Sequence, residues 1–161
     1  MTTPPYVAVV GPGEASAAEC AAAEEVGRRL AAAGAVVVCG GLGGVMEAAA
    51  RGAGASGGVA VGLLPGRDRA DGNRHLTVCL PTGLGELRNG LVVGTADGVV
   101  AVGGSWGTMS EVALALRTGK PVVSLAGWDL CPPSGHLPGP RPAASPQEAV
   151  ALVLASVGGR P

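Results

Sequence analysis

The stretch that decides the fold reads Asp97-Gly-Val-Val-Ala-Val-Gly-Gly-Ser-Trp-Gly-Thr-Met-Ser-Glu111. A short aliphatic strand at 99–102 runs into a glycine-rich turn, and we expect a helix from about 109 to 118. Glycine allows the backbone to turn sharply and to approach a ligand closely. The first turn of a helix presents unpaired N–H groups and the positive end of the helix dipole, an arrangement that binds phosphate. The stretch therefore predicts a strand–turn–helix unit with an anion site at 103–108.

The rest of the chain repeats this alternation of strand and helix. Apolar runs predict strands at 6–10, 36–39, 59–64, 76–80, 99–102 and 122–125, and helices are expected at about 16–33, 45–55, 84–95, 109–118 and 146–157. Ser16 and Glu19 have the spacing of a capping box at the start of the first helix. Strands that are apolar throughout predict a parallel sheet covered on both faces. We expect one α/β domain over 1–161, a doubly wound, Rossmann-like parallel sheet, with an irregular Pro- and Gly-rich loop at 126–145.

Glycine-rich turns follow three of the expected strands, at 11–13, 40–44 and 103–107. In a parallel sheet all three lie at the carboxyl edge, where ligands bind in doubly wound folds. The turn at 11–13 alone could equally be an ordinary strand–helix connection. The turn at 40–44 is not GxGxxG, and no acidic residue ends the next strand, which disfavours a standard NAD site. The chain also lacks the GxxxxGK[ST] pattern of P-loop NTPases.

Composition narrows the class of protein. The net charge is −1, which argues against a nucleic-acid partner, and no apolar run is long enough to span a membrane. The N-terminus has no features of a signal peptide, and the scattered cysteines (Cys20, Cys39, Cys79, Cys131) favour a reduced cytoplasmic protein with structural thiols. Neither they nor the two histidines complete a metal site. Because Phe is absent, aliphatic side chains must build the core.

Glu111 admits two interpretations. Thr108 and Glu111 match a capping box, in which Glu111 would only stabilise the start of the helix. The alternative is a carboxylate that reaches the ligand. Arg88 favours the second interpretation, because a cation inside the apolar stripe of its helix needs a partner, either an ordinary salt bridge or a site beside Glu111. Asn89 could hydrogen-bond a base or a ribose, and Cys39 is interpreted as a core residue.

Four segments together resemble the LOG-like (SLOG) superfamily of Rossmann proteins: 40–53, 62–66, 82–89 and 103–111. The chain is most similar to a small bacterial subgroup that also resembles molybdenum-cofactor carrier proteins. The superfamily includes the cytokinin riboside 5′-monophosphate phosphoribohydrolases. The resemblance implies catalytic roles for Arg88 and Glu111. It further implies phosphate binding by Gly103, Gly104, Gly107 and Thr108, and nucleotide or base binding by Gly11, Gly13, Gly40, Gly41, Gly43, Gly44, Met46, Thr82 and Asn89.

Two departures from the phosphoribohydrolase pattern keep two functions open. Val102 replaces the proline of PGGxGTxxE, and Asn89 replaces a lysine, an Arg-Asn form that carrier-like members share. One hypothesis is hydrolysis of the N-glycosidic bond of a nucleoside 5′-monophosphate, such as AMP or a cytokinin riboside monophosphate. The other is a non-catalytic carrier or sensor of a nucleotide or a pterin-type phosphate ligand. The resemblance also implies a homodimer without a resident cofactor, and the only lysine, Lys120, lies in a helix–strand turn, unsuited to lysine decarboxylation.

Overall fold

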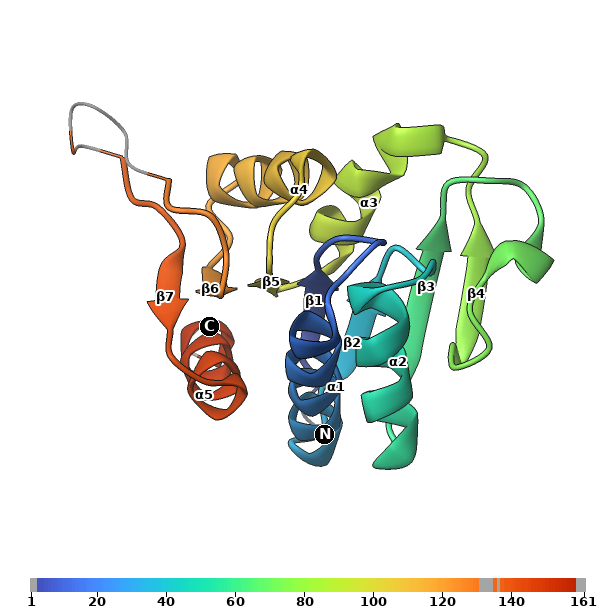
Figure 1. Ribbon diagram of the computed structural model, residues 1–161, viewed down its shortest axis with the longest axis horizontal. Helices are drawn as coiled ribbons and strands as arrows, with labels where there is room; N and C mark the ends of the chain where they lie inside the picture. The colour runs from blue at the N-terminus through green and yellow to red at the C-terminus, as the bar shows by residue number, and fades with distance from the viewer. Residues whose placement is uncertain (1–2, 131–134, 136, 159–161) are drawn as a thin grey trace.

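A computed structural model of the chain describes residues 3–130, 135 and 137–158. Seven strands, five α-helices and two short 3-10 helices alternate within these residues (Figure 1). The strands are β1 (Tyr6–Val10), β2 (Val36–Cys39), β3 (Ala60–Leu64), β4 (Val78–Pro81), β5 (Gly98–Val102), β6 (Val122–Leu125) and β7 (Arg141–Ala143). The helices are α1 (Ala17–Ala32), α2 (Val45–Ala55), η1 (Arg69–Asp71), η2 (Gly85–Leu87), α3 (Arg88–Thr95), α4 (Trp106–Arg117) and α5 (Pro146–Val157).

All strands form one parallel sheet in the order β4-β3-β2-β1-β5-β6-β7. The chain winds outward from β1 toward β4, then returns to β5 on the other side of β1 and winds outward again. The strand order therefore reverses between β1 and β5, which is the topological switch point of a doubly wound fold. The predicted α/β class and the parallel sheet are confirmed.

Helices cover both faces of the sheet, with α1, α2 and α5 on one side and α3 and α4 on the other (Figure 1). Alternate residues of each strand pack against opposite layers: Val7 and Val9 face α1, whereas Ala8 and Val10 face α3 and α4. The largest fully buried side chains are leucines and valines, Leu30 and Leu64 among them. The expected aliphatic core is therefore confirmed.

Glycines bring α1 and α2 into close contact. A Cβ added at Gly52 would overlap the backbone carbonyl oxygen of Glu24, and one added at Gly27 would overlap that of Ala49. An ion pair between Arg51 and Glu24, 2.7 Å from Nη2 to Oε2, spans the same contact. The two helices thus pack backbone to backbone, at positions where any side chain would separate them.

Several predicted boundaries differ from the structure. Helix α4 begins at Trp106 rather than at 109, and the expected helix at 84–95 is a 3-10 turn, η2, followed by α3 from Arg88. The loop expected at 126–145 contains a short strand, β7, which pairs with β6 through backbone hydrogen bonds that its Pro- and Gly-rich surroundings do not predict. Strand β4, at the edge of the sheet, begins at Val78, two residues later than the expected start at 76. Cys131 lies outside the described residues.

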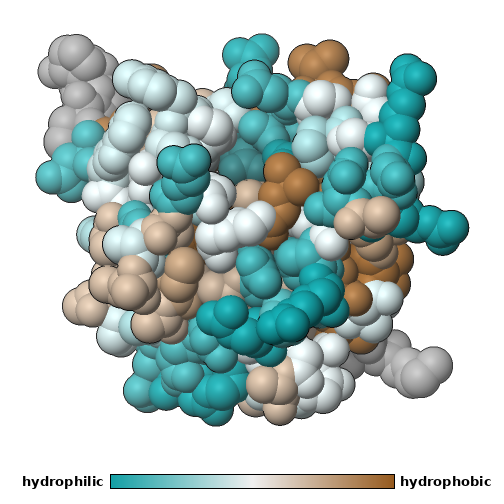
Figure 2. All heavy atoms as spheres, turned by 45° about the vertical axis from the view of Figure 1, so that its right-hand side comes forward, coloured by the Kyte–Doolittle hydropathy of each residue, from teal (hydrophilic) through white to brown (hydrophobic). Residues whose placement is uncertain are grey.

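The surface near β4 carries no broad apolar area. In Figure 2 hydrophobic side chains form small patches separated by hydrophilic ones, although Val78 and Leu80 of β4 are partly exposed. Among the described residues, no helix has the length and hydropathy needed to cross a membrane.

Candidate functional site

The turns that follow β1, β2 and β5 meet at the carboxyl edge of the sheet. Strands β1 and β5 are neighbours, with Val10 paired to Ala101, and β2 lies on the other side of β1. A Cβ added at Gly11 would lie 2.5 Å from the Val102 carbonyl oxygen, so the turn after β1 passes directly over the end of β5. The predicted convergence of the three turns at one point is confirmed.

Ser105 is the N-cap of α4. Its φ and ψ angles are −154° and 171°, and its hydroxyl accepts a hydrogen bond of 3.2 Å from the Thr108 backbone N–H. The predicted cap at Thr108 was wrong, because Thr108 occupies the third position of the helix and its hydroxyl lies 2.9 Å from that of Ser105. Glu111 lies one turn further along, where a capping box would not place it. The purely structural interpretation of Glu111 as a capping residue therefore fails.

Arg88 is buried where α3 begins, with only 8% of its surface exposed. Its Nη2 donates to the Gly40 carbonyl oxygen at 3.3 Å, and its Nη1 donates to Oδ1 of Asn89. A Cβ at Gly40 would lie 2.6 Å from Nη2, so the turn after β2 leaves room for this side chain because it has a glycine there. The Nε atom of Arg88 is buried without a hydrogen-bond partner among the described residues. Such an orphaned donor is uncommon in proteins and calls for an explanation in terms of the site around it.

Glu111 faces Arg88 from α4. The carboxylate Oε1 lies 3.9 Å from Arg88 Nη1, and both side chains are buried. Burial raises the pKa of the Glu111 carboxyl from 4.5 to about 7, against the opposing effect of the Arg88 charge. Asn89 links the two helices, because its Nδ2 donates to the Ser110 hydroxyl of α4 at 3.0 Å. A carboxyl that titrates near neutrality beside a fixed cation can exchange protons with a bound ligand.

A cavity of about 360 Å³ opens above these residues. Eight of the predicted site residues line it: Gly11, Gly13, Met46, Arg88, Asn89, Gly107, Thr108 and Glu111. Seven others lie outside its lining: Gly40, Gly41, Gly43, Gly44, Thr82, Gly103 and Gly104.

The predicted residues that do not line the cavity shape the turns that carry the lining residues. The Thr82 hydroxyl donates to the Leu64 carbonyl oxygen at 2.7 Å and accepts from Leu84 N–H, so it shapes the turn after β4. Gly44 has a φ of 63°, and a Cβ there would overlap the Pro12 carbonyl oxygen. Gly103 has a φ of 66°, and a Cβ there would overlap the Glu19 carboxylate of α1. These glycines allow neighbouring turns to pack closely, which places the lining residues.

Comparison with known proteins identifies the family. The sequence profile of the SLOG cluster4 family matches residues 4–147. The chain belongs to the SLOG cluster4 family. An uncharacterized protein of Archaeoglobus fulgidus is 39% identical to it over 150 residues, which cover 93% of this chain and 95% of that protein.

Solved structures of similar proteins share the whole fold of this SLOG cluster4 chain. The molybdenum cofactor binding protein of Rippkaea orientalis has a TM-score of 0.89 and 34% identity, covering 96% of this chain and 98% of its own. The molybdenum cofactor carrier protein of Chlamydomonas reinhardtii has a TM-score of 0.83 and 31% identity, covering 97% and 99%. The family resemblance inferred from the sequence is confirmed, including its likeness to carrier proteins.

The sequence interpretation missed four residues that line the Arg88–Glu111 cavity: Leu42, Pro65, Glu86 and Ser105. Ser105 could have been found, because serine after a glycine pair and before a helix is a preferred N-cap. The other three come from turns whose approach to the cavity depends on the packing of distant strands. Glu86 adds a carboxylate acceptor at the rim, beside Arg88 of the next element.

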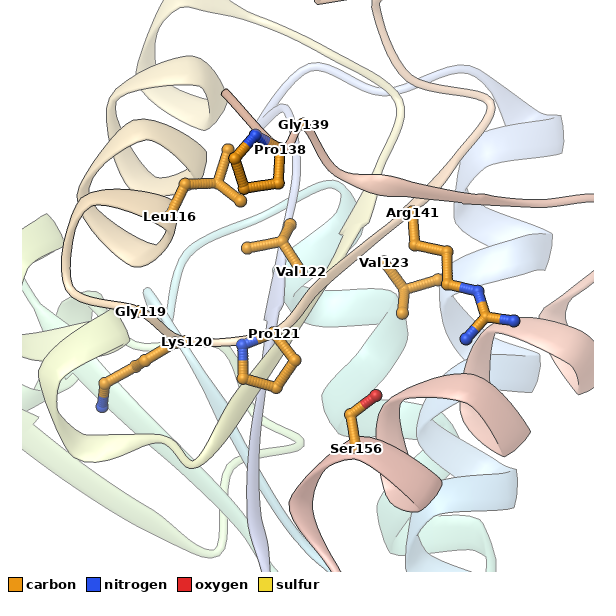
Figure 3. A pocket seen from close by; sticks show the side chains of 10 residues that line it. All are labelled: Leu116, Gly119, Lys120, Pro121, Val122, Val123, Pro138, Gly139, Arg141 and Ser156. Atoms are coloured by element: carbon orange, nitrogen blue, oxygen red, sulfur yellow. The ribbon is translucent and has the colours of Figure 1, made fainter. Parts of the chain in front are cut away.

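A second cavity, of about 450 Å³, lies at the opposite, amino edge of the sheet (Figure 3). Its two cationic residues, Lys120 and Arg141, lie on opposite sides of it. Lys120 lies in the helix–strand turn between α4 and β6, as expected, and its ammonium donates to the carbonyl oxygens of Gly94 and Ala96 at the end of α3. The glycine-rich turns that follow β1, β2 and β5 all lie at the carboxyl edge, so this second cavity is not the candidate site. Within the described residues, no cluster of His, Cys, Asp and Glu could hold a metal ion. Cys39 is buried, and burial raises the pKa of its thiol to about 11, as suits a core residue.

Proposed function

We propose that this protein binds a phosphorylated pterin-type ligand at the carboxyl edge of its sheet and acts as a molybdenum-cofactor carrier. The observation that carries the proposal is the buried Arg88, with its unpaired Nε, in a cavity at the N-terminus of α4. A buried cation and a helix N-terminus in one cavity form an electropositive site.

The phosphate anchor would be the first turn of α4. Helix geometry leaves the N–H groups of Trp106 and Gly107 without intrahelical acceptors, while Ser105 already accepts from Thr108. Gly107 lines the cavity, and its nearest neighbour to an added Cβ is the Ser105 hydroxyl at 3.8 Å, so its backbone is open to a ligand. Gly103 and Gly104 would shape the turn without contacting the phosphate, and the Thr108 hydroxyl would donate a further hydrogen bond to it.

The carrier role is supported by the likeness to two proteins that bind or carry the molybdenum cofactor, over nearly the whole length of each. It is also supported by Asn89. The amide oxygen of Asn89 accepts from Arg88 and its nitrogen donates to Ser110, which holds Arg88 in one position. A second cation at this place would instead repel Arg88. Glu86 would accept from the N–H groups of the ligand ring.

Hydrolysis of a nucleoside 5′-monophosphate is the second candidate, and the Arg88–Glu111 pair favours it. In this reaction water attacks the anomeric carbon, the N-glycosidic bond breaks, and the base leaves with a proton. The Glu111 carboxylate would stabilise the positively charged sugar or orient the water, and Arg88 would position Glu111 and the ribose. A carboxyl with a pKa of about 7 is suited to proton transfer at neutral pH.

Two assays separate the candidates. For the carrier, the protein is mixed with molybdenum cofactor released from a molybdoenzyme, and molybdenum and pterin fluorescence are followed through gel filtration. Co-elution in the parent and its loss in Arg88→Met, but not in the charge-matched control Arg117→Met, supports the carrier. For the hydrolase, the protein is incubated with AMP or a cytokinin riboside monophosphate, and free base is measured by chromatography. Release of base that is lost in Glu111→Gln would replace the carrier proposal with hydrolysis.

Homodimerisation and a cytoplasmic location belong to the same proposal. A dimer is what the resemblance to the superfamily implies. Sedimentation equilibrium at micromolar concentrations measures it directly, and a monomer at all concentrations would contradict it.

A further inference from the structure

Both tryptophans of this chain lie together beside the candidate site. The sequence contains two, Trp106 and Trp128. Their ring centroids are 5.1 Å apart and their planes meet at 86°, an edge-to-face contact. Trp106 is the first residue of α4, and Trp128 follows the end of β6.

Trp106 is held in an exposed position. It is 82% exposed, more than any other large apolar side chain among the described residues, and Trp128 is 42% exposed. Trp128 occupies the space that a side chain at Gly104 would take, since a Cβ there would lie 2.5 Å from its Cδ1. The glycine at position 104 therefore leaves room for the Trp128 ring, which contacts Trp106 edge to face.

Trp106 forms one wall of a groove of about 480 Å³ between α3 and α4. The groove adjoins the Arg88–Glu111 cavity, because Glu86, Asn89 and Gly107 line both. Its other lining is largely apolar, with Leu87 and Gly90 on one side and Leu114 on the other. A Cβ added at Gly90 would touch nothing within 4 Å, so the space above α3 is open. A charged cavity thus lies next to an apolar groove with an aromatic wall.

We propose that Trp106 stacks on the planar heteroaromatic ring of the ligand, while the ligand's phosphate binds near Arg88 and the first turn of α4. The inference rests on the proposed function and defines its ligand class: a purine or pterin that carries a phosphate, rather than a sugar phosphate. A tryptophan face binds such rings through stacking, with little dependence on their hydrogen-bonding groups. Trp106 is a specificity residue in this assignment, and Trp128 positions it.

The test compares ligands with and without a ring. AMP and neopterin monophosphate serve as ring-bearing probes, ribose 5-phosphate serves as the ring-free probe, and dissociation constants are measured by calorimetry. Trp106→Ala should weaken binding of at least one ring-bearing probe by roughly 5- to 150-fold and leave ribose 5-phosphate unchanged. Trp106→Phe should restore most of the affinity, because phenylalanine keeps a stacking face.

Gly90→Leu is a second variant that does not touch the aromatic pair. Leucine favours the helix more than glycine does, and at this half-buried position its side chain should fill the groove and block the ring. The matched control is Gly94→Leu, one turn further along α3. An added Cβ at Gly94 also touches nothing within 4 Å, but Gly94 does not line the groove. Gly94→Leu should bind every probe as the parent does.

Intrinsic fluorescence gives an independent readout. Trp128→Phe leaves Trp106 as the only tryptophan, and ring-bearing probes should quench its emission while ribose 5-phosphate should not. Equal weakening of all probes by Trp106→Ala, or no weakening of any, overturns the stacking proposal. Conversion of a dimer to a monomer by Trp106→Ala, with loss of all binding, also overturns it, because the groove would then be occupied by a second copy. If the parent binds no probe and no molybdenum cofactor, the proposed function fails together with this inference.

Discussion

The Arg88 guanidinium and the Glu111 carboxylate face each other at the floor of the cavity, 3.9 Å apart from Nη1 to Oε1. They come from different helices, α3 and α4, and both are buried. The distance is too long for a hydrogen bond, so the desolvation of each charge is only partly offset by the other. That imbalance raises the pKa of Glu111 and leaves Arg88 able to bind a further anion.

The pH dependence of stability should report Glu111. Its pKa is about 7 in the folded protein and 4.5 as the ordinary value, so the folded state binds the proton more tightly than the unfolded state. The resulting stabilisation is fully present below pH 4.5 and is lost as the pH rises through about 7. Between about pH 5 and pH 8 the parent should lose about 2–3 kcal/mol relative to Glu111→Gln, which cannot titrate. Urea unfolding at each pH measures this difference, and parallel profiles for the two proteins would contradict it.

Arg88→Met should weaken phosphate-ligand binding. Loss of a hydrogen bond to a charged group costs about 1.5–3 kcal/mol, which corresponds to a roughly 10- to 150-fold higher dissociation constant. Arg117→Met removes the same charge at the exposed C-terminal end of α4 and serves as the control. Calorimetric titration with AMP and neopterin monophosphate is the measurement, and equal effects of the two substitutions would show that only net charge matters.

Gly104→Ala should displace Trp128 rather than obstruct a phosphate directly. The resemblance implied that Gly104 binds the phosphate, but a Cβ added there would meet the Trp128 ring at 2.5 Å. The edge-to-face contact with Trp106 should then be lost, and the tryptophan emission should shift. Gly107→Ala is the contrasting variant, because an added Cβ there would have the Ser105 hydroxyl at 3.8 Å as its nearest neighbour beyond the adjoining residues and would not meet Trp128. It should keep the emission of the parent while its methyl group weakens ligand binding in the cavity.

Gly52→Ala should destabilise the protein through the α1–α2 contact. The added methyl group would overlap the Glu24 carbonyl oxygen, and overpacking of this kind costs about 1–3 kcal/mol. Gly54→Ala, in the same helix, touches nothing within 4 Å and should be neutral or stabilise by about 0.5–1 kcal/mol. Chemical unfolding of both variants measures the contrast, and similar stabilities would refute the close approach of the two helices.

Much of the fold follows from local patterns in the sequence. Strands β1 and β2 were predicted with the observed boundaries, because aliphatic runs ended by glycine specify buried parallel strands. The capping box is present, with the Ser16 hydroxyl accepting from Glu19 N–H at 3.2 Å and Glu19 accepting from Ser16 N–H at 2.8 Å. The order of strands and helices then places the glycine turns at one edge, which is enough to locate a candidate site.

What the sequence by itself determined is therefore the alternation, the family and the edge of the sheet that carries the site. The tertiary structure decided which side chains meet there. Arg88 finds the Gly40 carbonyl and Glu111 only because β2, β1 and β5 lie side by side, and Trp128 reaches Gly104 across the end of the sheet. The first turn of α4 was mispredicted because Ser105 and Thr108 are both good N-caps. Contacts between residues far apart in the chain depend on packing, which no local pattern encodes.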